Sequence, residues 1–541
     1  MRNIKEKKMM TKQVLLSGNE AIARGAYEAG AKVGTGYPGT PSTEILENLS
    51  KYDGVNCEWS VNEKVALEVG FGSCLAGQRT IVTMKHVGLN VAADPLFTSS
   101  YIGVKGGLVI IVADDPDMHS SQNEQDSRHY ARASQIPMLE PSNSQEAKNF
   151  VKLAFELSEK YDTPVFIRSV TRISHSKTIV DLCDPIKNPI KVGFKRNIMK
   201  YVMIPAFARI RHKEVLKRMA KLELDCNTFS INKKTITDKK IGIITSGIIY
   251  EYVKEVLPDV SILKLGIVYP LPMDLIRKFC ESIDTVYITE EVDPFIETEI
   301  KAKGITNLIG KDKFPLFGEL SPDIIYNTVM NVQEKDLISI DIEIPKRPPK
   351  LCPGCPHHQI FNVLNRLGLT VTGDIGCYTL GVLPPYSAMD TCLDMGASVT
   401  VSQGIELAEG KDFKNNTVAV IGDSTFAHSG ITGLINAVYN KRHSLVIVLD
   451  NSTTAMTGMQ PNPLSGETIN GDTTYAIDYQ KLAEAVGVKT EQIRIINAYK
   501  EEIMEDTVKE LLATKELAFM VIKGPCVLLK RKRAKQKRGK A

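Results

Sequence analysis

The C-terminal third of the chain has oxygen-rich side chains at the ends of two apolar runs. Both runs are typical of buried parallel strands, and open α/β sheets bind ligands at the carboxyl ends of such strands. Oxygen ligands suit Mg²⁺, with diphosphate oxygens completing its shell, and a glycine there permits close approach of the backbone. One Gly-Asp at a strand end is more often only a turn, but two such ends favour a cofactor site. Residues 417–421 are followed by Gly422, Asp423 and Ser424, and residues 445–449 by Asp450, Asn451, Ser452 and Thr453.

Four of the ten cysteines have a sequence context that favours metal binding. A Cys-x-x-Cys motif alone is common as a redox dithiol or as half of a zinc site. Two more cysteines preceded by Gly or Pro favour a four-thiolate site, which suits a [4Fe–4S] cluster or zinc, and the spacing does not separate these. The candidates are Cys352, Cys355, Cys377 and Cys526, and we interpret Cys57, Cys74, Cys183, Cys226, Cys280 and Cys392 as packing residues.

Two features near the N-terminus have side chains that suit a pocket. Thr40 and Pro41 follow the strand-like run 32–37, and they suit the cap and the first position of a helix. Glu63 begins a helical pattern at 63–77, where the helix dipole favours an acid in any case. Each feature therefore also has a purely structural interpretation.

Further polar residues stand at the ends of the next two strand-like runs. Lys85, His86 and Asn90 close one run, and the strongly polar stretch 119–128 follows the run 108–113. The stretch has the composition of a solvated loop. Because all these groups fall at carboxyl strand ends, they are also candidates for the same pocket as Thr40.

Length and composition indicate a multidomain globular protein. The 541 residues are too many for one core and suggest three or four domains. The net charge of +4 is uneven, because the last twelve residues carry eight Lys or Arg and no acid. This balance does not support a nucleic-acid partner. No apolar run approaches the roughly 18 residues of a membrane span, and no signal-peptide core is present, so we expect no membrane partner and a cytoplasmic location.

Short β-rich runs alternate with helical patterns, which predicts α/β layers around parallel sheets. The periodicity fades within 181–211, and the segment 346–350 (KRPPK) resembles a linker because paired prolines disfavour helix and central strand. The predicted strands are 32–37, 80–85, 108–113, 164–168, 241–245, 260–265, 285–289, 417–421 and 445–449.

Six long motifs, in order along the chain, closely resemble the alpha subunits of indolepyruvate:ferredoxin oxidoreductases, within the wider group of 2-oxoacid:ferredoxin oxidoreductases. They lie at 36–45, 59–72, 82–95, 113–128, 351–358 and 373–381, and the resemblance extends over residues 12–530. It implies a multidomain α/β thiamine-diphosphate-binding fold, with two parallel-sheet cofactor domains and a transketolase C-terminal-like domain. The implied segments are a pyrimidine-binding domain (1–180), a connecting region (181–224), the transketolase-like domain (225–345), a diphosphate and Mg²⁺ domain with the Cys₄ site (346–529) and a basic tail (530–541).

The resemblance also implies roles for particular residues. Glu63 matches the glutamate that activates the aminopyrimidine ring of thiamine diphosphate, and Thr40 matches a threonine that binds the substrate carboxylate. Lys85, His86 and Asn90 are weaker candidates for that pocket. The remaining matches are Asp423, Asn451 and the Thr453 carbonyl as Mg²⁺ ligands, and Cys352, Cys355, Cys377 and Cys526 as [4Fe–4S] ligands.

The implied reaction is oxidative decarboxylation of arylpyruvates to aryl-acetyl-CoA and CO₂, with a beta subunit, ferredoxin and coenzyme A as partners. Members of the family normally continue into a ferredoxin-like domain with two more clusters, whereas this chain stops at Ala541. We therefore expect one cluster rather than three, and a tail that is a linker or a solvated end. The alternatives are oxidation of another 2-oxoacid, a non-oxidative thiamine-diphosphate decarboxylase or ligase with zinc or no metal at the cysteines, and a non-catalytic scaffold.

Overall fold

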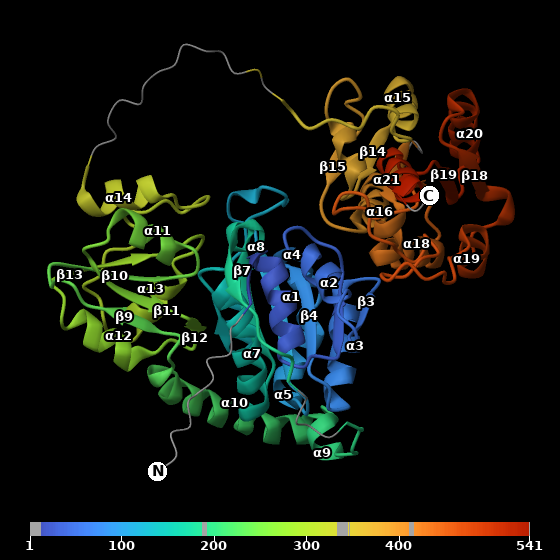
Figure 1. Cartoon of the computed structure of the whole chain (residues 1–541). Coiled ribbons are helices and arrows are strands. Elements are labelled where there is room, and N and C mark those ends of the chain that lie inside the picture. The colour runs from blue at the N-terminus through green and yellow to red at the C-terminus, as the bar shows by residue number, and fades with distance from the viewer. Residues whose placement is uncertain (1–11, 187–191, 333–344, 346, 411–415, 540–541) are drawn as a thin grey trace. The chain divides into compact units, whose positions relative to one another are not determined.

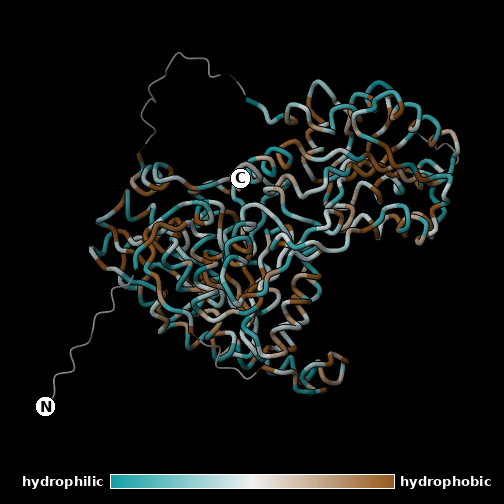
Figure 2. Tube along the Cα trace, turned by 45° about the vertical axis from the view of Figure 1, so that its right-hand side comes forward, coloured by the Kyte–Doolittle hydropathy of each residue, from teal (hydrophilic) through white to brown (hydrophobic). Residues whose placement is uncertain are grey.

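The computed structural model describes residues 12–186, 192–332, 345, 347–410 and 416–539. The chain divides into two compact units, residues 1–340 and 341–541. Each unit is an α/β fold built on predominantly parallel sheets (Figure 1), which confirms the fold class expected from the sequence. In both units the hydrophobic residues gather along the interior strands (Figure 2), as burial on both faces of a parallel sheet requires.

The larger sheet of the N-terminal unit has seven strands. They are β2 (Val33–Gly36), β3 (Asn56–Trp59), β4 (Thr80–Lys85), β5 (Leu108–Asp114), β6 (Met138–Leu139), β7 (Val165–Val170) and β12 (Ile267–Tyr269). Their order is β12-β6-β7-β5-β4-β2-β3, and β12 alone is antiparallel to its neighbour. The central strands β4 and β5 are buried throughout, so polar groups from this sheet reach a pocket only beyond the strand ends.

Helices cover both faces of this sheet. They are α1 (Gly18–Glu28), α2 (Thr43–Leu49), α3 (Glu63–Leu75), α4 (His86–Val91), α5 (Ala93–Ile102), α6 (Arg128–Ser134), α7 (Ser144–Tyr161) and α8 (Thr171–His175). α1 packs against α2 and α7, whereas α3 packs against α5. The start of α3 is fixed by Asn62, whose side chain accepts a hydrogen bond from the Val65 amide at 2.9 Å. The cap places Glu63 at the first position of the helix.

A second, four-stranded sheet shares the core of this unit. Its strands are β9 (Lys233–Thr235), β10 (Ile241–Ser246), β11 (Ser261–Leu265) and β13 (Thr285–Thr289), in the order β13-β10-β11-β9. Its helices are α11 (Ile249–Val256), α12 (Met273–Cys280), α13 (Phe295–Ala302) and α14 (Pro322–Met330). One hydrophobic cluster contains both Phe166 of β7 and Leu263 of β11. The two sheets therefore form one compact unit.

Three further pieces complete the N-terminal unit. β1 (Gln13–Ser17) pairs with β8 (Lys177–Asp181) in a separate antiparallel ribbon. The region where the sequence periodicity fades contains the short helix α9 (Ile198–Tyr201) and the start of α10 (Pro205–Asp225), which packs against α5.

The C-terminal unit is built on a fully parallel sheet in the order β15-β14-β16-β17-β19-β18. The strands are β14 (Thr370–Gly373), β15 (Thr391–Cys392), β16 (Thr417–Gly422), β17 (Leu445–Asp450), β18 (Ile493–Asn497) and β19 (Ala518–Lys523). The helices are α15 (His358–Leu367), α16 (Ala397–Glu409), α17 (Asp423–Thr425), α18 (Ile431–Tyr439), α19 (Tyr479–Val486), α20 (Glu501–Ala513) and α21 (Val527–Gly539). Residues 530–539 of the predicted basic tail thus lie within α21, whereas residues 540–541 and part of the predicted linker lie outside the described residues.

All nine predicted strands are present, most within one or two residues of their predicted ends. The helix start predicted at Thr40 and Pro41 is wrong: α2 begins at Thr43 after Ser42, and Thr40 and Pro41 belong to the preceding turn. Within the described residues, no helix is both long and apolar enough to cross a membrane.

Candidate cofactor and substrate sites

In the C-terminal unit, Asp423 is the first residue after β16 and is almost fully buried. Its carboxylate accepts hydrogen bonds from the backbone amides of Ser424 at 2.8 Å and Thr453 at 3.1 Å. The side-chain amide of Asn462 donates at 3.4 Å. Because β16 and β17 are adjacent and parallel, the two strand ends singled out in the sequence meet at one edge. The structure therefore brings Asp423 next to the turn that carries Asn451 and Thr453.

Electrostatics at this edge favour a bound cation. Burial, together with the neighbouring Asp450 carboxylate, raises the pKa of Asp423 to about 7, and burial also raises the pKa of Asp450. Among the described residues, Lys523 is the one basic side chain that forms an ion pair with either carboxylate, at 4.0 Å from Asp450. Two buried carboxylates disfavour ionisation unless positive charge is supplied. The Asp423 carboxylate and the Asn451 amide oxygen both accept from the Thr453 amide at 3.1 Å, and such oxygens are the ligands that Mg²⁺ takes.

The other predicted residues of this edge lie in the same small region. The Ser424 hydroxyl accepts a hydrogen bond from Thr454 at 2.8 Å, and the Thr453 hydroxyl donates to the Gln460 carbonyl at 3.0 Å. A β-carbon at Gly422 would lie 2.5 Å from the ring of Tyr378, so the glycine also makes room for a buried tyrosine.

The four candidate cysteines come together from three segments. Burial raises the pKa of Cys377 to about 12, and the nearby Cys355, Cys526 and Cys352 thiols act in the same direction. The pKa of Cys355 is raised to about 11 by burial and by Cys352 and Cys526. Four crowded thiols that oppose one another's ionisation fit a positively charged metal group that binds them as thiolates.

Four thiolates are a ligand set for a single zinc ion and for a [4Fe–4S] cluster alike. A separate set of possible metal ligands, Asp126, His129 and Asp293, lies in the N-terminal unit, with ligand atoms within 4.8 Å of one another.

His357 connects the cysteine segment to the carboxylate edge, and the sequence did not identify it. It is buried, its Nε2 lies 3.4 Å from the side-chain nitrogen of Asn451, and burial lowers its pKa to about 4. The ring is therefore neutral and orients the Asn451 amide. The Cys526 amide donates to the Asn451 carbonyl at 2.9 Å. The motif Cys-Pro-His-His was a signal for this role that the sequence interpretation left unused.

In the N-terminal unit, Glu63 is buried at the start of α3. Gly88 of α4 lies directly against its carboxyl group, so that any β-carbon at position 88 would clash with the Glu63 side chain. The glycine, which the sequence did not flag, lets α4 approach the carboxyl. Glu63 therefore occupies a confined position in which its side chain has little freedom.

Thr40, Lys85 and His86 meet around the loop that follows β5. Lys85 Nζ donates to the Ser120 carbonyl at 2.7 Å, and the Ser120 hydroxyl donates to the Thr40 carbonyl at 3.3 Å. His86 Nε2 lies 3.2 Å from the Asn123 carbonyl, while its buried Nδ1 has no hydrogen-bond partner in the described part of the chain. Burial lowers the pKa of Lys85 to about 8 and lowers that of His86. The strand ends that the sequence predicted to share one pocket thus lie close together. Ser120 joins them through its hydrogen bonds to Lys85 and Thr40.

Two interpretations of surrounding residues are corrected by the structure. Cys183 and Cys392 are exposed rather than packed. The polar stretch 119–128 is not simply solvated, because Asp126 and Arg128 are buried and form an ion pair at 2.5 Å. The Asp126 carboxylate, already bound by Arg128, is a poor metal ligand. Asn90 lies at the exposed rim, hydrogen-bonded to Gln125 and Tyr130.

Two segments of the chain match families of thiamine-diphosphate-binding domains. Residues 24–205 match the thiamine-diphosphate-binding domain of pyruvate flavodoxin/ferredoxin oxidoreductases. Residues 374–522 match the C-terminal binding domain of thiamine pyrophosphate enzymes. The chain therefore contains thiamine-diphosphate-binding domains.

Curated relatives extend the similarity to nearly the whole chain. The indolepyruvate oxidoreductase subunit IorA of Archaeoglobus fulgidus is 41% identical, over 98% of this chain and 88% of that protein. The subunit IorA of Pyrococcus horikoshii is also 41% identical, over 95% of this chain and 86% of its own length. The 2-oxoglutarate synthase subunit KorA of Methanothermobacter thermautotrophicus is more distant, at 28% identity over 33% of this chain and 50% of its own length.

A solved structure supports the fold. The 2-oxoglutarate:ferredoxin oxidoreductase of Magnetococcus marinus superposes with a TM-score of 0.52 at 16% identity, covering 60% of this chain and 66% of that one. The domain matches and the full-length relatives together show that the chain belongs to the indolepyruvate oxidoreductase subunit IorA family of thiamine-diphosphate-dependent 2-oxoacid oxidoreductases.

Proposed function

We propose that this chain is the alpha subunit of an indolepyruvate:ferredoxin oxidoreductase. The enzyme oxidatively decarboxylates arylpyruvates: the carboxylate leaves as CO₂, the acyl carbon joins the sulfur of coenzyme A with release of the thiol proton, and two electrons pass to two oxidised ferredoxins. The single observation that carries the proposal is the close grouping, in one unit, of the Asp423 carboxylate edge and four mutually interacting cysteines. The full-length similarity to IorA subunits gives the substrate class.

The residues of the C-terminal unit hold the charged cofactors in this proposal. Asp423, the Asn451 amide oxygen and the Thr453 carbonyl would hold Mg²⁺, and Gly422 and Ser424 would lie against the diphosphate. Cys352, Cys355, Cys377 and Cys526 would hold one [4Fe–4S] cluster, which would supply a one-electron acceptor. The raised pKa of Asp423 supports the Mg²⁺ assignment, because Asp423 is a buried carboxylate beside a second carboxylate. The proximity of the four cysteine thiols supports the cluster assignment.

The residues of the N-terminal unit handle protons and the substrate. Thiamine diphosphate supplies the carbon nucleophile for the 2-oxo group and an electron sink after loss of CO₂. Glu63 would share a proton with the ring nitrogen of the aminopyrimidine, and Gly88 keeps the Glu63 carboxyl confined. Thr40, Lys85 and His86 orient the substrate carboxylate, and the buried, unpartnered Nδ1 of His86 is available for a hydrogen bond.

The proposal is tested on anaerobically purified complex with its partner subunit. Coenzyme-A-dependent reduction of ferredoxin, and of a viologen dye as a control acceptor, is measured with indolepyruvate, phenylpyruvate, pyruvate and 2-oxoglutarate. We expect the arylpyruvates to have the highest kcat/KM and to form acyl-CoA. Preference for a different 2-oxoacid would correct the substrate class. Acid or aldehyde release without dye reduction, in protein with zinc and no labile sulfide, would overturn the oxidoreductase assignment.

A further inference from the structure

The loop between β5 and α6, residues 115–127, contacts three of the candidate substrate-binding residues. Its Ser120 carbonyl and hydroxyl accept hydrogen bonds from Lys85, and its Asn123 carbonyl contacts His86. The same Ser120 hydroxyl donates to the backbone carbonyl of Thr40. A shift of this loop would therefore move the partners of the Lys85 and His86 side chains and of the Thr40 backbone at once.

The loop is strained where it leaves the sheet. Asp117 has φ of 66° and Met118 has φ of 50°, and this left-handed region is unfavourable for residues with a β-carbon. On the inner side Asp115 holds the loop, since its carboxylate accepts from the Ser120 amide at 2.8 Å and from the Thr171 hydroxyl at 2.6 Å. These contacts fix Ser120 but leave the Asp117 turn to be held from elsewhere.

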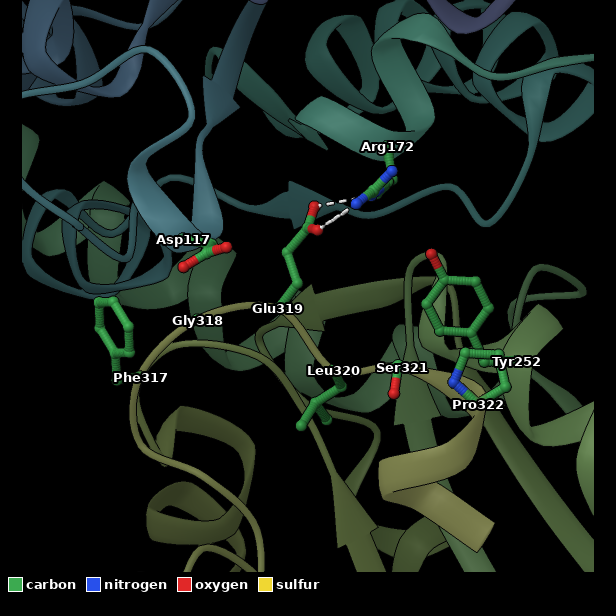
Figure 3. Close-up of a pocket in the computed structure, with 9 residues that line it drawn as sticks. All are labelled: Asp117, Arg172, Tyr252, Phe317, Gly318, Glu319, Leu320, Ser321 and Pro322. Carbon is green, nitrogen blue, oxygen red and sulfur yellow. Dashed lines mark hydrogen bonds and ion pairs between the residues drawn. The ribbon is translucent and has the colours of Figure 1, made fainter. Parts of the chain in front are cut away.

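The outer support comes from the segment that precedes α14, residues 317–319. Glu124 of the loop accepts hydrogen bonds from the amides of Asp117 at 2.7 Å and Gly318 at 3.3 Å, so it joins the loop to that segment. Glu319 binds His119 of the loop at 3.2 Å. Its carboxylate is in turn fixed by Arg172 of α8 in a two-pronged ion pair of 2.6 to 3.0 Å (Figure 3).

A cavity lies beside these polar contacts. Its volume is about 480 Å³, and its lining includes Asp117 of the loop, Arg172, Tyr252, Phe317 and Glu319 (Figure 3). On this side the hydrogen bond of Glu124 and the ion pair of Glu319 join the loop to the segment.

We propose that Glu124 and Glu319 are positioning residues for the 2-oxoacid pocket. Through them the segment at 317–319, which belongs to the four-stranded half of the unit, sets the position of Ser120 and Asn123 and so the affinity for substrate. The inference rests on the proposed function of Lys85 and His86, but it assigns a role in substrate binding to residues outside the pocket.

The test compares Glu319→Ala and Glu124→Ala with Glu299→Ala in the purified complex. Glu299 is a matched control because it binds Arg132 at 2.8 Å between α13 and α6, and so also links the two halves of the unit, but away from the loop. We expect kcat/KM for the 2-oxoacid to fall up to roughly 10²-fold in the first two variants, mainly through KM, as misplacement of binding groups does. Thiamine diphosphate affinity and the control variant should match wild type, and Glu319→Gln should recover part of the loss because its amide oxygen still accepts from Arg172.

Hydrogen exchange gives a second readout that does not depend on the reaction. The amide of Ser120, which donates to Asp115, and the amide of Asp117, which donates to Glu124, should exchange faster in Glu319→Ala than in wild type or Glu299→Ala. Unchanged exchange, or unchanged KM in both alanine variants, would overturn the positioning role. An inactive wild-type complex would reject the proposed function instead, and the exchange rates would still decide whether Glu319 holds the loop.

Discussion

Two buried charge clusters, one in each unit, are balanced in opposite ways. In the N-terminal unit, Arg168 is bound to Asp114 at 2.7 Å and Glu140 at 2.5 Å, and Arg128 is bound to Asp126 and Glu290. At the C-terminal edge, the buried Asp423 carboxylate has the Asp450 carboxylate as its neighbour instead of a cation, and its pKa rises to about 7. A completed network of the first kind stabilises the fold, whereas a buried pair of carboxylates fits a site for an external cation.

The strongest test of this contrast is to remove the metal ligand at the C-terminal edge. Asp423→Ala should abolish retention of thiamine diphosphate and Mg²⁺ while the fold is kept, because the central hard ligand is lost. Calorimetric titration of the apoprotein measures the affinity, with exposed Asp472→Ala as the control from the same unit. Cofactor affinity at the wild-type level would show that Asp423 is not part of the site.

A second test concerns the cysteines. Cys377→Ser should remove most of the iron and labile sulfide and stop ferredoxin reduction, because a [4Fe–4S] cluster needs four thiolates. Thiamine diphosphate should stay bound, and exposed Cys392→Ser should behave as wild type. Wild-type preparations should contain about one cluster per chain. Full iron content in the Cys377 variant would remove this residue from the ligand set.

The third test separates chemistry from binding at Glu63. Glu63→Gln keeps the size of the side chain and one hydrogen bond but removes the titratable proton. Exchange of the thiazolium C2 proton, followed by NMR, should slow by roughly 10²–10⁴-fold while cofactor affinity changes little. Glu68→Gln, at an exposed position of the same helix, is the control. Exchange at the wild-type rate would exclude Glu63 as the activating acid.

The fourth test addresses the completed networks. Arg168→Ala leaves Asp114 and Glu140 buried without their cation, so urea unfolding of the N-terminal unit should lose about 3–5 kcal/mol. Arg132→Ala, in an exposed pair with Glu299, should change stability by less than about 1 kcal/mol. Similar losses in both variants would contradict the distinction between the two kinds of charge.

The sequence predicted the parts of the fold that depend on local patterns. β4 and β13 match their predicted ends because uninterrupted apolar and β-branched residues define them. The start of α2 was missed because Pro41 suits a first helical position, whereas here it lies in a turn before Ser42. The contact between Glu124 and Gly318 joins residues 194 positions apart. Sequence patterns give no signal for such a pair, so the outer support of the loop required the structure.

The antiparallel strand β12 gives the first sheet an unusual order of synthesis. Its pairing partner β6 ends at Leu139, and the other strands of the sheet are complete at Val170, but β12 begins only at Ile267. At the usual 5–20 residues per second, a ribosome needs about 5–20 s to make the intervening stretch. During that time the growing chain has an open sheet edge, which is a template for misassembly. β6 is only two residues long, and such a short edge limits that risk until β12 emerges to cover it.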